Sequence, residues 1–218
     1  MKVVELFTSI EGEGVRAGRL CTFIRLAGCN LNCTYCDTKQ AQDFNVGTDM
    51  TAEEIVAQVD SISLSDLVTL TGGEPLSRCR KDVLELLELL YLKGYQVNIE
   101  TNGSVDVLPF RAFTNTFFTV DYKSPSSGCE GAMVVPMFYK LRSRDVVKFV
   151  VGSIEDLETA VRVCSNDRIR AVVYVSPVFG QIEPVEIVEF MKQHPICSDW
   201  RLQIQLHKVV WDPNMKGV

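Results

Sequence analysis

Apolar segments typical of buried strands alternate with amphipathic segments typical of helices along most of this chain. Strand-like runs lie at 20–28, 66–75, 95–103, 117–125, 145–152, 169–178 and 201–211, and helix-like segments at 51–59, 80–94, 153–164 and 183–194. The strand-like runs are almost continuously apolar, which indicates parallel strands covered on both faces by crossover helices. There are too few of them for a full eight-unit barrel. The sequence therefore predicts one α/β domain over 1–218, a partial, open TIM-like barrel of about six mainly parallel strands.

Helix-capping residues support the predicted helices. Thr51 and Glu54 have the spacing of a capping box, and Ser153 suits the first position of its helix. Pro184 falls in a first helical turn, and Gly94 suits the end of the helix at 80–94.

The composition is that of a globular protein, with 46% hydrophobic and 23% charged residues among 218. No apolar run reaches the ~18 residues of a membrane span. The first residues also lack the apolar stretch of a signal peptide, so we expect a cytoplasmic protein without a membrane partner. The net charge of −6, without any basic run, argues against nucleic acid as the main partner.

Three of the eight cysteines, Cys29, Cys33 and Cys36, fall within the stretch "GCNLNCTYCDT" at 28–38. In a reducing compartment such close spacing suggests a metal, a cluster or redox chemistry. A structural zinc site takes four ligands, usually as two separated pairs. Three thiolates suit a four-iron cluster with one iron left open for chemistry. The other five are scattered singly, which favours small buried apolar residues: Cys21, Cys79, Cys129, Cys164 and Cys197.

Polar motifs follow four successive predicted strands. They are the cysteine loop, "TGGEP" at 71–75, "ETNGS" at 100–104 and "DYKSP" at 121–125. In parallel α/β folds the chemistry lies at the carboxyl ends of the strands. We therefore expect these four motifs to form one shared site.

The spacing C-x3-C-x2-C, with Tyr35 before the last cysteine, resembles the radical S-adenosylmethionine superfamily. "TGGEP" is similar to the glycine-rich motif of that superfamily. The resemblance implies a [4Fe-4S] cluster held by Cys29, Cys33 and Cys36, whose open iron binds S-adenosylmethionine. It also implies an electron donor such as a flavodoxin or a ferredoxin.

The stretch at 7–38, "TGGEP", "ETNG" and "LQIQLHKVVW" together resemble the 7-carboxy-7-deazaguanine synthase family over nearly the whole chain. That resemblance implies conversion of 6-carboxy-5,6,7,8-tetrahydropterin to 7-carboxy-7-deazaguanine, with loss of ammonia, in queuosine or 7-deazapurine biosynthesis. It also implies Mg²⁺ as a further cofactor, an abbreviated barrel and a homodimer.

The same resemblance assigns residues to the site. Substrate-binding residues would be Ile10, Glu11, Gly12, Glu13, Arg25, Thr71 and His207. Residues facing S-adenosylmethionine would be Tyr35, Asp37, Gly73, Asp121, Tyr122 and Lys123. Thr38 would bind Mg²⁺, a hard cation that prefers oxygen ligands. Glu11 stands where the family more often has glutamine.

The residue chemistry agrees with a carboxylated pterin. The guanidinium of Arg25 lies within an apolar strand and can hold a carboxylate through two parallel hydrogen bonds. The loop "SIEGEG" offers carboxylates and backbone amides to a polar ring edge. His207 can instead be a core histidine, and Thr38 a turn residue.

Two other functions remain open from the sequence. A glycyl-radical activating enzyme shares the cysteine motif but acts on a protein, and it would not need "SIEGEG" or Thr38. A non-catalytic iron–sulfur or zinc module would need a fourth ligand and would have no use for "TGGEP".

Overall fold

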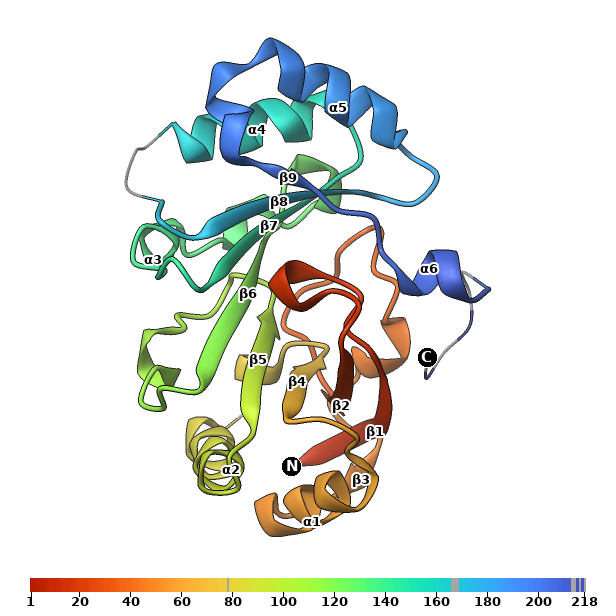
Figure 1. The fold of residues 1–218 in the computed structure, drawn as a ribbon, viewed down its shortest axis with the longest axis vertical. Coiled ribbons are helices and arrows are strands. Elements are labelled where there is room, and N and C mark those ends of the chain that lie inside the picture. Colours follow the sequence, from red (N-terminus) through yellow and green to blue (C-terminus); the bar gives the residue numbers. More distant parts are fainter. Residues whose placement is uncertain (78, 166–168, 213–214, 216, 218) are drawn as a thin grey trace.

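The computed structural model describes residues 1–77, 79–165, 169–212, 215 and 217. Within this part of the chain, nine strands form one sheet in the order β3-β1-β2-β4-β5-β6-β7-β8-β9 (Figure 1). The strands are β1 (Lys2–Ile10), β2 (Leu20–Leu26), β3 (Thr48–Asp49), β4 (Leu67–Gly72), β5 (Gln96–Thr101), β6 (Thr116–Tyr122), β7 (Val146–Val151), β8 (Val172–Pro177) and β9 (Arg201–Leu202). The helices are α1 (Ala52–Ile62), α2 (Arg80–Leu92), α3 (Val135–Phe138), α4 (Ile154–Cys164), α5 (Pro184–Gln193) and α6 (His207–Val210).

Six neighbouring strands, β2 and β4 to β8, run parallel to one another. This confirms the predicted open, mainly parallel sheet with crossover helices. The short strand β9 extends the sheet in parallel at one edge, and β1 pairs antiparallel with both β2 and β3 at the other. Strand β1 was not predicted from the sequence, because its nine residues mix polar with apolar side chains and most of them are only half-buried.

The core lies between the sheet and its crossover helices. Ile24, Leu70, Ile99, Phe118 and Phe149 project from successive strands into it and are at most 1% exposed. Figure 1 shows α1 and α2 at one end of the row of strands and α4 and α5 at the other. In the same view, the loop between β1 and β2 lies across the strands, away from these helices. Because the helices do not cover them there, the carboxyl ends of the strands and the loop between β1 and β2 can form a site.

The predicted helix boundaries agree closely with the structure. The capping box is complete: the Glu54 amide donates to Thr51 Oγ1 at 3.2 Å, and the Thr51 amide donates to Glu54 Oε2 at 2.8 Å. Ser153 Oγ accepts from the Asp156 amide, and Pro184 opens α5. Gly94 ends α2 with a φ of +83°, a conformation that glycine adopts without steric cost.

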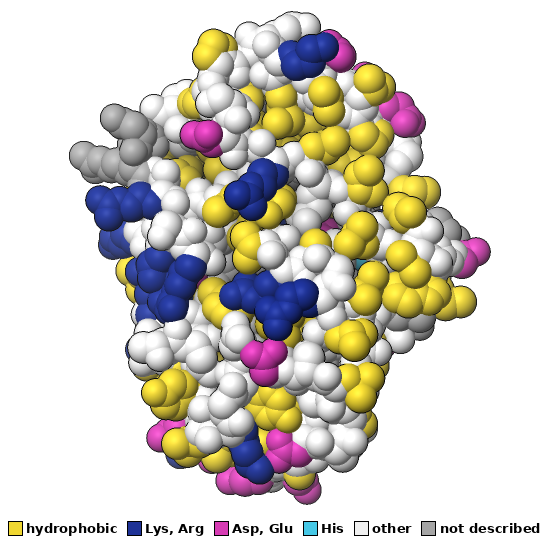
Figure 2. Space-filling view, viewed as in Figure 1, with side chains coloured by type: hydrophobic (Ala, Val, Ile, Leu, Met, Phe, Trp, Pro, Cys, Tyr) yellow, Lys and Arg dark blue, Asp and Glu magenta, His cyan; other side chains and the backbone are white. Residues whose placement is uncertain are grey.

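The predicted strand at 201–211 is wrong beyond Leu202. The polar side chain of Gln203 turns to the loop after β1, where its Oε1 accepts from the Gly14 amide at 2.8 Å. The chain then leaves the sheet edge and forms α6, so that the apolar side chains of Val209 and Val210 are exposed rather than buried. Figure 2 shows apolar side chains gathered on this part of the surface.

None of the described helices is long and apolar enough to cross a membrane.

Two of the five single cysteines are buried as predicted, Cys21 and Cys197, and Cys129 and Cys164 are partly buried. The prediction is wrong for Cys79, which is exposed at the start of α2.

Candidate active site

A cavity of about 550 Å³ opens at the carboxyl ends of the parallel strands. The cysteine loop after β2 and the loops after β4, β5 and β6 all contribute to its wall, together with the loop after β1 and the segment leading into α6. Every residue assigned to the site from the sequence lines this cavity except Tyr122. The four strand-end motifs therefore do meet at one place.

Tyr122 faces away from the cavity. Successive residues of a strand point to opposite faces, so Asp121 and Lys123 reach the cavity while the Tyr122 ring enters the core. There the ring packs against Phe138 and Phe149, with centroid separations of 5.4 and 5.3 Å. The structure does not bring this side chain to the other predicted site residues.

Backbone hydrogen bonds fix the cysteine loop at both of its sides. The Gly28 amide donates to the Ala41 carbonyl at 2.7 Å, and the Cys29 amide donates to the Gln42 carbonyl at 3.0 Å. On the other side, the Glu74 amide of "TGGEP" donates to the Gly28 carbonyl at 2.8 Å. The start of the loop is thus held between two segments from elsewhere in the chain.

Gly73 allows this close approach. A Cβ atom at this position would lie 2.4 Å from the Gly28 carbonyl oxygen and 2.8 Å from that of Ala41. Both neighbours are backbone atoms, which cannot move aside as a flexible side chain can. The second glycine of "TGGEP" is therefore required for contact between its loop and the cysteine loop.

Glu74 joins the loop after β4 to the loop after β5. Its buried carboxylate accepts from the Asn102 amide at 2.6 Å, from Thr101 Oγ1 at 2.8 Å and from the Leu76 amide at 3.0 Å. Burial raises the pKa of Glu74 to about 7, against the opposing effect of these hydrogen bonds. We call the cysteine loop, 71–75 and 100–104 together the cysteine end of the cavity.

The donor set at the cysteine end fits a four-iron cluster better than a single ion. Cys29, Cys33 and Cys36 all line the cavity. Among the described residues, no group of three or more His, Cys, Asp or Glu side chains is arranged around a single metal ion. In a four-iron cluster each cysteine binds a different iron, so the thiols must surround a larger group. Three thiols leave one iron without a protein ligand.

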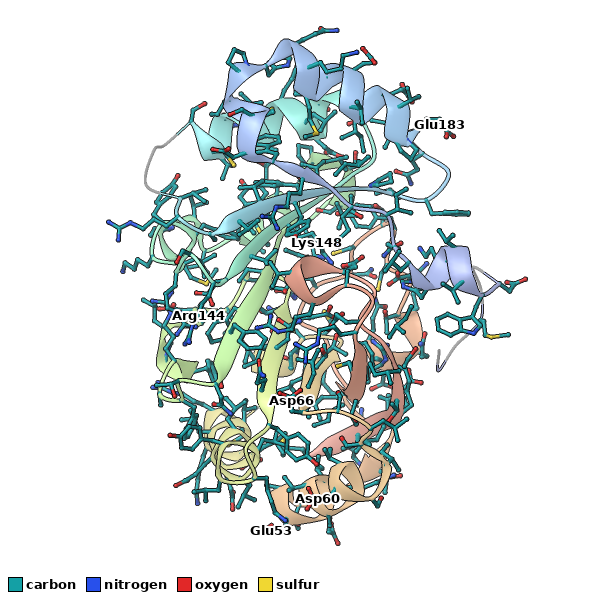
Figure 3. All side chains as sticks on the ribbon, in the orientation of Figure 1. Glu53, Asp60, Asp66, Arg144, Lys148 and Glu183 are labelled. Atoms are coloured by element: carbon teal, nitrogen blue, oxygen red, sulfur yellow. The ribbon has the colours of Figure 1, made fainter. Side chains whose placement is uncertain are left out.

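Charged side chains from β7, from the end of β6 and from the loop after β1 also line the cavity. Lys148 of β7 forms ion pairs with Glu13 and, at 3.1 Å, with Asp121, and Lys123 pairs with Asp121 at 2.9 Å. Figure 3 shows Lys148 at the centre of the molecule, beside the loop after β1. Although burial opposes a charge here, the carboxylates of Asp121 and Glu13 hold the pKa of Lys148 above its ordinary value. Lys148 is therefore a buried cation at working pH.

Glu11 lies deeper, and it is 1% exposed. Its Oε2 accepts from Thr69 Oγ1 at 2.5 Å. Burial, followed by the charge of Glu100, raises the pKa of Glu11 to about 8. At neutral pH this carboxyl is mostly protonated, so it can donate one hydrogen bond and accept others.

The C-terminal segment closes this side of the cavity. Gln205 Nε2 donates to Glu13 Oε1 at 2.8 Å, and His207 Nδ1 would lie 2.9 Å from a Cβ atom added at Gly12. Burial lowers the pKa of His207, which favours its neutral form. We call the group formed by Glu11, Glu13, Lys148, Gln205 and His207 the carboxylate end of the cavity.

Two further predicted residues have polar partners. Arg25 donates through Nε to Glu5 at 2.6 Å, and both side chains are partly buried at the cavity wall. Thr38 donates through Oγ1 to Asp37 at 2.9 Å, and Lys208 lies 3.8 Å from the same carboxylate.

Sequence reasoning missed several residues of the cavity. Lys148 was a charged residue within an apolar strand, a signal that went unused, and Glu100 and Asn102 lay within the quoted "ETNG". The segment 126–129 lies outside the cavity lining but contacts the cysteine loop, where Thr34 Oγ1 donates to the Ser126 carbonyl at 2.6 Å.

Comparison with known proteins agrees with this site. Residues 23–193 match the model of the radical SAM superfamily. A 7-carboxy-7-deazaguanine synthase of Clostridium acetobutylicum is 48% identical, over 100% of this chain and 99% of its own length. That of Methanospirillum hungatei is 39% identical, over 98% of this chain and 86% of its own.

The chain belongs to the 7-carboxy-7-deazaguanine synthase family of the radical SAM superfamily.

A solved structure agrees with this family membership. The crystal structure of QueE from Escherichia coli superposes with a TM-score of 0.73 at 26% identity, covering 94% of this chain and 93% of that one. The chain is therefore a radical S-adenosylmethionine enzyme with a [4Fe-4S] cluster and S-adenosylmethionine as its cofactors. The cysteine end of the cavity is where its sequence carries the cluster motif.

Proposed function

We propose that this enzyme converts 6-carboxy-5,6,7,8-tetrahydropterin to 7-carboxy-7-deazaguanine with release of ammonia, a step of queuosine and 7-deazapurine biosynthesis. The observation that carries the proposal is the 48% identity to a 7-carboxy-7-deazaguanine synthase along the full chain. The cavity supports it, because three thiols line it together with several carboxyl and amide groups. In a glycyl-radical activating enzyme, the cavity would have to bind a segment of a partner protein. A non-catalytic iron–sulfur or zinc module would need neither the cysteine end nor the carboxylate end of a substrate cavity.

The cysteine end, together with the neighbouring Asp121 and Lys123, holds the cofactors in this proposal. Cys29, Cys33 and Cys36 bind the cluster, and S-adenosylmethionine lies against Tyr35, Asp37, Gly73, Asp121 and Lys123. When bound, the cluster supplies one electron that cleaves S-adenosylmethionine and produces the 5′-deoxyadenosyl radical. The protein orients both groups and keeps water from the reacting atoms.

The carboxylate end binds the pterin. Glu11, Glu13 and His207 offer hydrogen-bonding groups to the polar ring edge, supported by the backbone of Ile10 and Gly12. The protonated carboxyl of Glu11 can replace the hydrogen bonds of a glutamine, since it too can both donate and accept. Thr71, near the carboxyl end of β4, lines the same cavity and would also contact the substrate.

The substrate carboxylate is assigned to Arg25, with Mg²⁺ held at Thr38. Arg25 and Thr38 line the same cavity, and in this proposal the substrate carboxylate contacts both the guanidinium and the hydrated cation. A hydroxyl is a weak ligand alone, and Mg²⁺ needs other oxygen ligands from the substrate and from water.

The remaining proposals concern the whole protein. We infer a homodimer, a flavodoxin or ferredoxin as electron donor, and the cytoplasm as the compartment, where the donor and eight free cysteines stay reduced. Residues 1–218 would act as one domain, because the nine described strands share one sheet.

Product analysis tests the reaction. Protein reconstituted anaerobically with iron and sulfide is given S-adenosylmethionine, a reductant and the pterin, and the products are identified by mass spectrometry. We expect 7-carboxy-7-deazaguanine and an equal amount of ammonia. Cleavage of S-adenosylmethionine without that product, or only with a protein substrate, would contradict the proposed function.

A further inference from the structure

Asn102 lies in the loop after β5, against the cysteine loop, and the residue is 6% exposed. Its Nδ2 donates to the Sγ atom of Cys29 at 3.7 Å and to Asn30 Oδ1 at 3.2 Å. The two hydrogens of one amide group therefore serve two acceptors of the cysteine loop.

The orientation of this amide group is fixed by a backbone donor. The Ser104 amide, which can only donate, lies 3.0 Å from Asn102 Oδ1, and Ser104 Oγ lies 2.6 Å from the same atom. The oxygen must therefore face Ser104, so the nitrogen must face Cys29. The Asn102 backbone is anchored separately, since its N–H donates to Glu74 Oε2 at 2.6 Å.

The Cys29 sulfur also accepts from the Leu31 backbone amide at 3.5 Å. N–H groups directed at a cysteine sulfur stabilise negative charge on it, and this effect is stronger where water is excluded. A cluster gains one negative charge when it is reduced, and hydrogen bonds to its sulfurs help to set its potential. A donor at Cys29 thus favours the reduced cluster.

We propose that Asn102 is a positioning residue that orients the Cys29 thiolate and raises the reduction potential of the bound cluster. Its side chain would make the cluster easier to reduce without touching substrate. The inference rests on the cofactor of the superfamily and not on the proposed pterin. It can therefore be tested with no substrate present, and its failure would not contradict the proposed reaction.

The test is an anaerobic potentiometric titration of the reconstituted protein, followed by the electron paramagnetic resonance signal of the reduced cluster. Asn102→Ala removes the donor without adding charge, and we expect a lower midpoint potential with the iron content of the parent. Asn102→Asp keeps an oxygen for Ser104 but replaces the donor by a carboxylate, and we expect a larger decrease. An unchanged potential in both variants would overturn the proposal.

Ser104→Ala is the control for turn structure. It removes the hydroxyl that donates to Asn102 Oδ1 and accepts from Asn30 Nδ2, but it leaves the Ser104 amide and the contact between Asn102 and Cys29. We expect its potential to equal that of the parent. A decrease as large as in Asn102→Ala would mean that turn structure, and not the N–H···S contact, sets the potential.

A measurement on the parent protein covers the case in which the variants lose their cluster. With ¹⁵N-asparagine incorporated, pulsed electron paramagnetic resonance of the reduced cluster should detect an exchangeable amide proton and its nitrogen. Absence of that coupling would overturn the role of Asn102.

Discussion

The cysteine end and the carboxylate end of the cavity are built by different kinds of contact. At the cysteine end, the loops that follow neighbouring parallel strands bond to one another, chiefly through Glu74 and the Gly28 carbonyl. At the carboxylate end, Gln203 and Gln205 reach from the C-terminal segment to Gly14 and Glu13, 189 and 192 positions away. The cysteine end therefore depends on motifs that follow adjacent strands of one sheet. The carboxylate end requires contacts between the N-terminal and C-terminal parts of the chain.

This difference suggests that the two ends can be perturbed separately. A substitution at the cysteine end should affect cluster and cofactor binding. A substitution at the carboxylate end should affect pterin binding while leaving the cluster in place. The four predictions below follow from that separation, from the largest expected effect to the smallest.

The largest effect is expected at the three cysteines. Replacing Cys29, Cys33 or Cys36 by Ala should remove the bound cluster and all product formation, because each of the three thiolates would bind a different iron and no other protein ligand would replace it. Cys21→Ala and Cys129→Ser should keep both, measured as iron content and product per protein. Loss of the cluster in Cys21→Ala would contradict a three-cysteine site.

Arg25→Lys should weaken pterin binding, since an ammonium cannot form the two parallel hydrogen bonds of a guanidinium. A lost charge-assisted hydrogen bond costs on the order of 1.5–3 kcal/mol. The matched variant Glu5→Gln removes the charge that pairs with Arg25 in the protein without substrate. It should leave the affinity unchanged or increase it, as measured by calorimetry with the cluster intact. Equal losses in both variants would indicate that the pair is only structural.

Glu11 gives the carboxylate end a pH dependence of stability. Its pKa in the folded protein is about 8, above the ordinary value of 4.5, so the folded state holds a proton that the unfolded state has released. Stability from this group is present below pH 4.5 and is lost as the pH rises toward 8. Glu11→Gln should therefore gain stability relative to the parent between pH 6 and pH 8, measured by anaerobic denaturant unfolding. A constant difference across this range would contradict the raised pKa.

Thr38→Ala should have the smallest effect. Its hydroxyl lies at the cavity wall, and Mg²⁺ bound there would take most of its other ligands from substrate and water. The variant should keep its iron and lose most of the stimulation of turnover by Mg²⁺. Product formation is measured against Mg²⁺ concentration for both proteins. If the two curves coincide, Thr38 is a turn residue and not a metal ligand.

The cysteine end could be predicted from local motifs, whereas at the carboxylate end the family resemblance assigned Glu11, Glu13 and His207 but not Lys148 or Gln205. The cysteine spacing, "TGGEP" and "ETNG" each end a strand, and parallel strands bring such ends together. The pairing of Lys148 with Glu13 spans 135 positions and leaves no local pattern. The hydrogen bond from Thr34 in the cysteine loop to the Ser126 carbonyl spans 92 positions and leaves no local pattern either.

Two predictions failed for reasons that the sequence did contain. Tyr122 was assigned to the site with Asp121 and Lys123, although alternation along a strand places the middle residue on the other face. The segment at 201–211 is apolar enough for a strand, but Gln203 and Gln205 bond to the loop after β1 and draw the chain away from the sheet. Apolar composition alone did not decide its structure.

The most direct test of the separation between the two ends is calorimetric titration of both ligands into Glu13→Gln loaded with its cluster. Glu13 accepts from Gln205 and pairs with Lys148, so its neutral replacement perturbs the carboxylate end while Asp121 still neutralises Lys148. We predict that the affinity for S-adenosylmethionine stays within about twofold of the parent while the pterin binds about ten- to a hundredfold more weakly, the loss of one charge-assisted hydrogen bond. Equal weakening of both ligands, or an unchanged pterin affinity, would contradict the account.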